Sequence, residues 1–173
     1  SSSDSAMISV SIQASQVPEI SNPIFTICES EIFTVADFGA TGNGGILNYY
    51  FSNGSTITAV NTTDLLQTGT YFVTQIGPAN TCESIDSLEI TVTIGTTPAP
   101  TASEMNQAFC VTDNALVSDL VLDASTNTLN FLFDNGILVI SVSLTDVLLA
   151  GNYFITATDP NTNCSSLDSL LIT

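Results

Sequence analysis

Residues 64–73 read DLLQTGTYFV, and residues 146–155 read DVLLAGNYFI. The shift that aligns these two stretches also places Cys28 on Cys110 and Cys82 on Cys164, with no gap between them. Over residues 28–91 against 110–173, the alignment contains 24 identities in 64 positions. Self-similarity at a fixed period is the signature of a repeat protein, so the sequence predicts two copies of one structural unit.

The same register sets the expected domain boundaries. The residues Ile8-Ser9-Val10-Ser11-Ile12 fall on Ile90-Thr91-Val92-Thr93-Ile94. We therefore expect residues 1–12 to be the last strand of a preceding repeat, 13–95 to be repeat one, 96–101 to be a Pro/Thr linker, and 102–173 to be repeat two, truncated in its last strand. The two linker prolines favour an extended, semi-rigid connection. We expect the chain to be part of a longer array.

Strand periodicity dominates within each unit. Apolar and polar side chains alternate over residues 88–94, which is typical of a strand with one buried face. Asn53-Gly54 and Asn135-Gly136 each separate two apolar runs, the strongest short-range signal for a β-hairpin. No long segment has a helical period. Six or seven short strands in about 80 residues predict an all-β fold of β-sandwich domains.

The Asp-x4-Gly-x-Tyr pattern of residues 64–71 and 146–153 resembles the tyrosine corner that opens strand F of immunoglobulin-like domains. In antibody-type domains a core cysteine follows two residues after this tyrosine, whereas Val73 and Ile155 stand here and the chain has no Trp. The resemblance implies tandem immunoglobulin-like β-sandwich domains without the antibody-type core. Four aspartates are predicted to cap turns: Asp37, Asp64, Asp119 and Asp146.

The composition excludes several functions. The chain has 173 residues with 17 Asp and Glu and no Lys, Arg or His, so its formal net charge is −17. Without cationic side chains it cannot neutralise phosphates, which excludes nucleic-acid binding, and an anionic membrane surface repels it. No Ser-His or Cys-His pair can form. The apolar fraction of 44% suits packed domains, while the apolar runs are too short for membrane insertion.

The four cysteines allow three disulfide pairings. The two cysteines of each repeat are equally spaced, which favours Cys28–Cys82 and Cys110–Cys164, one bond inside each repeat. The alternative bond, Cys82–Cys110, would lock neighbouring repeats together across the linker, and a further alternative leaves the thiols buried and unoxidised. Disulfides imply an oxidising compartment, so we expect an extracellular location.

Four motifs together carry a family resemblance: residues 27–28 (IC), 35–37 (VAD), 64–72 (DLLQTGTYF) and 82–88 (CESIDSL). They are similar to the immunoglobulin-like repeats of giant, acidic, type IX-secreted adhesins, which gliding Bacteroidota move along their outer surface. Many such repeats carry a Trp-Tyr pair where this chain has Asn48-Tyr49 and Asn130-Phe131. The resemblance implies a location on the surface of a Gram-negative bacterium and a part in attachment or gliding motility.

A second resemblance concerns glycosylation. Bacteria of this group attach O-glycans at Asp-Ser/Thr followed by a small or aliphatic residue. Three triplets fit this pattern at the repeat interval, and they contain Ser5, Ser87 and Ser169. The resemblance implies a glycoprotein modified once in each repeat. The alternative is a polar pair that begins a strand without any modification.

No catalytic residues are predicted, and no cofactor is expected, with Ca²⁺ as the alternative. Residues Asp159, Asn161 and Asn163 imitate the first half of a calcium loop, but the loop's glycine and its final glutamate are replaced by Cys164 and Leu170. A turn is the favoured interpretation of this segment. A carboxylate pair is the only catalytic device open to this composition, and no motif places two acids in a cleft.

These observations predict a structural repeat that acts as a spacer or stalk in a secreted cell-surface adhesin or filament, and no enzyme. The expected partners are the neighbouring repeats of the same chain, and surface polysaccharide or other filament subunits. Two alternatives stay open. One is a carbohydrate- or calcium-binding module, and the other is a self-assembling filament subunit in which strands are added between chains.

Overall fold

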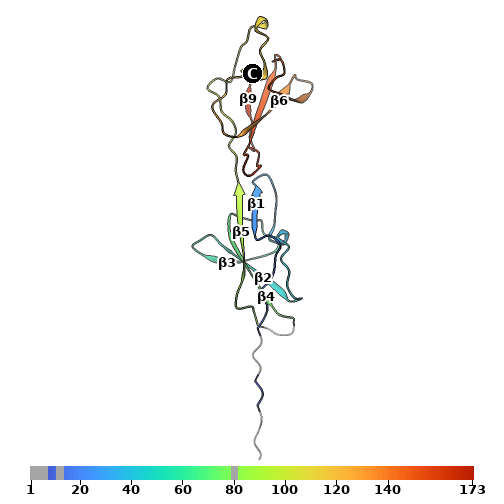
Figure 1. The fold of residues 1–173 in the computed structure, drawn as a ribbon, viewed down its shortest axis with the longest axis vertical. Helices are drawn as coiled ribbons and strands as arrows, with labels where there is room; N and C mark the ends of the chain where they lie inside the picture. The colour runs from blue at the N-terminus through green and yellow to red at the C-terminus, as the bar shows by residue number, and fades with distance from the viewer. Residues whose placement is uncertain (1–7, 11–13, 79–81) are drawn as a thin grey trace, which may run out of the picture. The chain divides into compact units, whose positions relative to one another are not determined.

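The computed structural model describes residues 8–10, 14–78 and 82–173 (Figure 1). It divides into two compact units: one contains the described residues up to Phe25 together with Ile32–Thr93, and the other contains Thr26–Glu31 together with Ile94–Thr173. The strands form two sheets, ordered β1-β5-β4-β2-β3 and β7-β6-β8-β9. The helical segments of the described residues are three short 3₁₀ turns. The predicted all-β fold is confirmed, and the two sheets are consistent with a β-sandwich.

The strands recur in the register of the sequence repeat. The five-stranded sheet consists of β1 (Ile24–Cys28), β2 (Ile46–Ser52), β3 (Ile57–Val60), β4 (Gly69–Ile76) and β5 (Leu88–Gly95). The four-stranded sheet consists of β6 (Thr128–Asp134), β7 (Val139–Val142), β8 (Asn152–Thr158) and β9 (Leu170–Ile172). Strands β2 and β6 begin at corresponding positions of the repeat, and so do β3 and β7. Strand β5 has eight residues, whereas β9 has three.

The predicted alternation of β5 is confirmed by burial. Ile90 and Val92 are 0% and 1% exposed, while Glu89, Thr91 and Thr93 are exposed. Side chains of a strand point alternately to opposite faces, so this strand contributes one face to the core and the other to solvent.

The two predicted hairpins form with longer loops than a two-residue turn. Ser52 pairs with Ile57, so residues 53–56 connect β2 to β3. The Asn53 side-chain oxygen accepts hydrogen bonds from the amides of Ser55 at 2.9 Å and Thr56 at 3.0 Å. Gly54 has a φ of 88°, which favours glycine. The second hairpin repeats this arrangement at Asn135 and Gly136.

Short extended segments supply the second layer opposite each sheet. In the first unit, Thr34 and Leu65 form an isolated bridge, and the 3₁₀ turn Val35–Phe38 follows it. The Phe38 ring packs edge-on against the Tyr71 ring of β4, with centroids 5.0 Å apart. The second unit repeats this layer with the bridge Leu116↔Val147 and the turn Val117–Asp119.

The predicted aspartate caps are confirmed, and all four share one geometry. Each carboxylate accepts a hydrogen bond from the backbone amide three residues before it. Asp37 binds the Thr34 amide at 2.7 Å, and its counterpart Asp119 binds the Leu116 amide at 2.8 Å. The other two pairs are Asp64 with the Asn61 amide (2.8 Å) and Asp146 with the Ser143 amide (2.7 Å). The Thr34 amide and hydroxyl hold the pKa of Asp37 below its usual 3.8 because both bonds favour the ionised form.

Both tyrosine corners form as the sequence predicts. Tyr71 and Tyr153 are 1% and 3% exposed. The Tyr71 hydroxyl accepts a hydrogen bond from the Gln67 amide at 2.8 Å. The Tyr153 hydroxyl accepts one from the Leu149 amide at 2.9 Å and donates to the carbonyl of the same residue at 3.2 Å.

The shared spacing of glycine and tyrosine in these corners has a steric cause. A Cβ atom at Gly69 would lie 2.6 Å from both the Phe51 ring and the Ser52 carbonyl oxygen. A Cβ atom at the counterpart Gly151 would lie 2.4 Å from the Phe133 ring. A side chain at either position would push β4 or β8 away from its neighbouring strand.

The tyrosine corner gives a stability prediction. The substitution Tyr153→Phe should lower the free energy of unfolding by about 1–3 kcal/mol, because it leaves the Leu149 amide without its acceptor. Chemical denaturation followed by circular dichroism measures the change. Tyr49→Phe is the matched control, and it should change stability by less than about 0.5 kcal/mol. Equal effects of the two substitutions would contradict a structural role for the corner hydroxyl.

Candidate functional site

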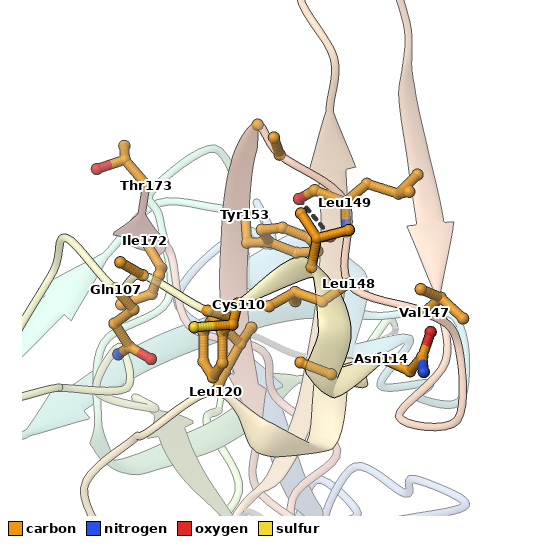
Figure 2. Close-up of a pocket in the computed structure, with 16 residues that line it drawn as sticks. Gln107, Cys110, Asn114, Leu120, Val147, Leu148, Leu149, Tyr153, Ile172 and Thr173 are labelled. Atoms are coloured by element: carbon orange, nitrogen blue, oxygen red, sulfur yellow. Dashed lines mark hydrogen bonds between the residues drawn. The ribbon is translucent and has the colours of Figure 1, made fainter.

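The second unit contains an apolar groove of about 520 Å³ (Figure 2). One wall is the segment 107–111, which carries Cys110, and another is the turn 147–151 that precedes β8. Leu120, Tyr153 and Ile172 line the interior. The Tyr153 hydroxyl is bonded to the Leu149 backbone, so the groove interior presents mainly hydrocarbon.

Apolar side chains that line the groove are more exposed than their counterparts in the first unit. Phe109 is 38% exposed, whereas its counterpart Ile27 is 6% exposed. Leu148 is only partly buried, while its counterpart Leu66 is buried. The two repeats therefore differ in burial at this place although their strands correspond.

A short backbone ladder runs along one edge of the groove. The Thr173 amide donates to the Met105 carbonyl at 2.8 Å, and the Gln107 amide donates to the Thr173 carbonyl at 2.9 Å. The first unit contains the counterpart of the first of these bonds, from the Thr91 amide to the Pro23 carbonyl at 2.8 Å. The segment that contains Met105 thus pairs with Thr173, just after β9, in the same register in which Pro23, just before β1, pairs with β5.

The disulfide prediction is wrong in its pairing. The structure joins Cys28 to Cys164, with their Cα atoms 5.2 Å apart, and forms neither Cys28–Cys82 nor Cys110–Cys164. Both bonded cysteines belong to the second compact unit, because that unit includes Thr26–Glu31. The alternative Cys82–Cys110 bond is also not formed, and both of these cysteines are exposed. The equal spacing identified which cysteines correspond, but it carried no information on which corresponding pair meets.

Hydrogen bonds surround the disulfide. Cys164 is 1% exposed, and its carbonyl accepts a hydrogen bond from the Thr97 hydroxyl at 2.7 Å. The Glu29 amide, one residue after Cys28, donates to the Gly95 carbonyl at 3.2 Å. These bonds hold the two cysteine-bearing segments against residues 95–97, at the end of β5 and just after it.

The structure describes two of the three predicted glycosylation serines. Ser87 and Ser169 are both exposed, and each lies directly before the first residue of β5 or β9. The next residue points inward in both cases, since Leu88 is partly buried and Leu170 is 6% exposed. Ser5 lies outside the described residues. Modification itself stays a prediction.

The calcium-loop candidates form a turn. The Asp159 carboxylate accepts hydrogen bonds from the Asn161 amide at 2.8 Å and from the Asn161 side chain at 3.2 Å. The Asn163 amide binds the Asp159 carbonyl at 2.8 Å, and Asn163 adopts a left-handed φ of 58°. In the part of the chain that the structure describes, no group of three or more acidic, Cys or His residues is arranged to hold a metal ion.

One polar cluster was missed by the sequence analysis. The Glu83 carboxylate accepts hydrogen bonds from the Thr74 hydroxyl, from the side-chain amide of Asn48 at 3.0 Å and from the Tyr50 hydroxyl at 3.2 Å. All three bonds lower the pKa of Glu83 because they favour its ionised form, and the bonds from Thr74 and Asn48 have the larger effects. Glu83 has no acidic counterpart, since Ser165 stands at that position in the second repeat. No repeated signal could therefore have revealed this cluster.

Comparisons with known proteins assign no family. No family model matches the chain, and no curated protein is significantly similar to it. Within the described residues, no helix has the length and apolarity needed to cross a membrane.

The disulfide gives the next prediction. Cys164→Ser should lower the free energy of unfolding by up to about 5 kcal/mol, because the bond closes a loop with a sequence separation of 136 residues. Guanidinium unfolding under non-reducing conditions measures the loss. Cys110→Ser is the matched control, since Cys110 lies outside the disulfide, and it should leave the unfolding midpoint unchanged. A reductant should remove the difference between wild type and Cys164→Ser, and unfolding that is insensitive to both treatments would contradict the bond.

Proposed function

We propose that the chain is a pair of structural, immunoglobulin-like repeats that serve as a spacer in a secreted cell-surface adhesin or filament. The observation that carries this proposal is the recurrence, in the register of the sequence repeat, of elements that build the scaffold. The aspartate caps, the tyrosine corners and the hairpins recur with matching geometry. Selection for an architecture that can be repeated along a chain explains why the two repeats share residues at these positions and differ at most others.

An extracellular location is supported by the disulfide, since such bonds persist in oxidising compartments. The resemblance to acidic adhesin repeats of gliding Bacteroidota points the same way and adds a part in attachment or gliding motility. A chain without Lys or Arg also offers no cleavage site to trypsin-like proteases, which suits long survival outside a cell.

A non-enzymatic role is supported by how the carboxylates are used. Asp37, Asp64, Asp119 and Asp146 each accept backbone amides in turns, and Asp159 does the same in its own turn. A carboxylate that accepts a backbone amide in a turn stabilises that turn, and the turn fixes the orientation of the carboxylate.

One observation favours a carbohydrate-binding module as a second candidate. A shallow depression in the first unit is lined by residues 47–50 and 59–62, which include Tyr49 and Tyr50. The Glu83 carboxylate bonds to the hydroxyl of Tyr50 at its side. An aromatic ring beside a carboxylate is a common platform for a sugar, and the second repeat has Phe131 and Leu132 instead. Because the platform is not repeated, we rank this function below the spacer.

Surface shaving of the native organism tests the spacer proposal. An antibody raised against the purified chain should label intact cells, and proteinase K should remove the label. Trypsin should release this region uncut, because it contains no Lys or Arg. Labelling that requires permeabilised cells would contradict a surface location.

Two results would favour a binding module instead. One is specific glycan binding that Tyr50→Ala abolishes. The other is a rise in Tm with Ca²⁺ that Asp159→Ala abolishes.

Glycosylation generates a separate prediction. Ser87 and Ser169 are exposed and occupy the same register, so a transferase can reach both. Intact-mass measurement of protein from the native host should show O-linked sugar, and Ser87→Ala should remove one glycan. Ser55→Ala is the matched control at an exposed serine outside the triplets. An unmodified native mass would show that the Asp-Ser-Leu triplets only begin strands.

A further inference from the structure

The chain contains three Asn-Gly pairs, at residues 43–44, 53–54 and 135–136. In such a pair the backbone nitrogen of the glycine can attack the side-chain carbonyl of the asparagine, because glycine has no side chain that hinders the close approach. The attack is assisted by donors that stabilise the negative charge on the carbonyl oxygen and by a base that takes the amide proton. The three pairs differ in which of these groups the fold supplies.

The hairpin between β6 and β7 supplies both kinds of group. The Asn135 side-chain oxygen accepts hydrogen bonds from the amides of Ile137 and Leu138, both at 2.9 Å. Two donors at this distance polarise the carbonyl and stabilise the charge that develops on its oxygen during attack. The Gly136 amide, which is the nucleophile, donates to the Asp134 carboxylate at 2.7 Å. That carboxylate is therefore placed to take the amide proton.

The hairpin between β2 and β3 has the donors but a different acceptor for the glycine amide. The Asn53 side-chain oxygen accepts hydrogen bonds from the two amides that follow Gly54, at 2.9 and 3.0 Å. The Gly54 amide donates to the Ser52 hydroxyl at 3.2 Å, and Ser52 is the counterpart of Asp134. A neutral hydroxyl is a much weaker base than a carboxylate, so this pair has the oxyanion donors without the base.

The third pair is held by side chains. The Asn43 side-chain oxygen accepts a hydrogen bond from the side chain of Gln75, which is 0% exposed. The Asn43 side-chain nitrogen donates to the Gln16 side-chain oxygen at 3.2 Å. Both ends of the side-chain amide are thus fixed, and a rotation of Asn43 toward the Gly44 nitrogen would break these bonds.

We propose that Asn135-Gly136 is an autocatalytic deamidation site at which the fold promotes closure of a succinimide ring. The Gly136 nitrogen forms a bond to the Asn135 side-chain carbon while Asp134 takes the proton of that nitrogen. The carbon–nitrogen bond of the side-chain amide then breaks, the proton passes to the leaving nitrogen, and ammonia is released. Water opens the ring at either carbonyl and gives aspartate or isoaspartate. One water replaces one ammonia, and nothing is oxidised or reduced.

The product changes the charge of this hairpin. No acidic residue lies between Asp134 and Asp146 in the sequence, and Ile137 and Leu138 are 94% and 60% exposed. Strand β7, which follows them, lies at the edge of its sheet. A new carboxylate before an apolar edge strand hinders pairing of that edge with other strands. The site does not depend on the spacer function, so either proposal can fail without the other.

Ageing of the folded, full-length chain at neutral pH tests the proposal. Peptide mapping with chymotrypsin and mass spectrometry measures how fast each asparagine is converted to an acid. Asn135 should react about tenfold faster than Asn53, since a positioned base contributes at least this much although solvent hydroxide acts at both sites. Asn53 should in turn react faster than Asn43. Any other order, or equal rates at Asn135 and Asn53, overturns the proposal.

Exchange of the residue that accepts the glycine amide tests the base. Asp134→Ser should slow the reaction of Asn135 to the rate of Asn53, and Ser52→Asp should speed the reaction of Asn53 about tenfold. Asp159→Ser is the matched control, because it removes a carboxylate from another turn, and it should leave all three rates unchanged. Circular dichroism checks that each variant is folded. Rates that do not respond to either exchange overturn the role of Asp134.

Concentrated urea tests whether the fold is the cause. Unfolding removes the hydrogen bonds at all three Asn-Gly pairs, so their rates should converge. A ranking that persists in urea comes from neighbouring residues in the sequence, and it overturns the assignment to the folded hairpin.

Discussion

The fold depends on hydrogen bonds that backbone amides donate to aspartate carboxylates. A chain with 17 acidic residues and no Lys, Arg or His has no basic side chain with which to pair a carboxylate. Four aspartates instead accept a hydrogen bond from the amide three residues earlier, and each such bond closes a turn; they are Asp37, Asp64, Asp119 and Asp146. These turns lie beside the isolated bridges Thr34↔Leu65 and Leu116↔Val147, so carboxylates that would otherwise only repel one another help to position the second layer.

The tyrosine corner links this second layer to the sheet. Its hydroxyl binds the backbone just before β4 or β8, while its ring lies in the core against Phe51 or Phe133. A buried hydroxyl requires a partner, and here that partner is the loop that also carries the aspartate cap. The cap and the corner therefore constrain the same short segment from both ends, which explains why its sequence is the most regular part of the repeat.

The second unit departs from this shared scaffold at the groove. The two units share their strands and turns, yet the second unit leaves Phe109 and Leu148 incompletely covered. The same region carries Cys110, which is exposed, whereas its counterpart Cys28 is bonded to Cys164. The repeat therefore sets the scaffold, while side-chain burial and cysteine pairing differ between its two copies.

The sequence alone determined the repeat, the all-β class, the hairpins, the aspartate caps and the tyrosine corners. These features are encoded in residues a few positions apart, whose periodicity and turn chemistry act locally. The lengths of the hairpin loops were predicted less accurately, because the pairing of Ser52 with Ile57 depends on the neighbouring strands. Only the tertiary structure decided the disulfide, the groove and the Glu83 cluster. Cys82 and Cys164 occupy the same position of the repeat, so the sequence could not tell which of these two equivalent cysteines meets Cys28, and only the path of the chain in space makes them different.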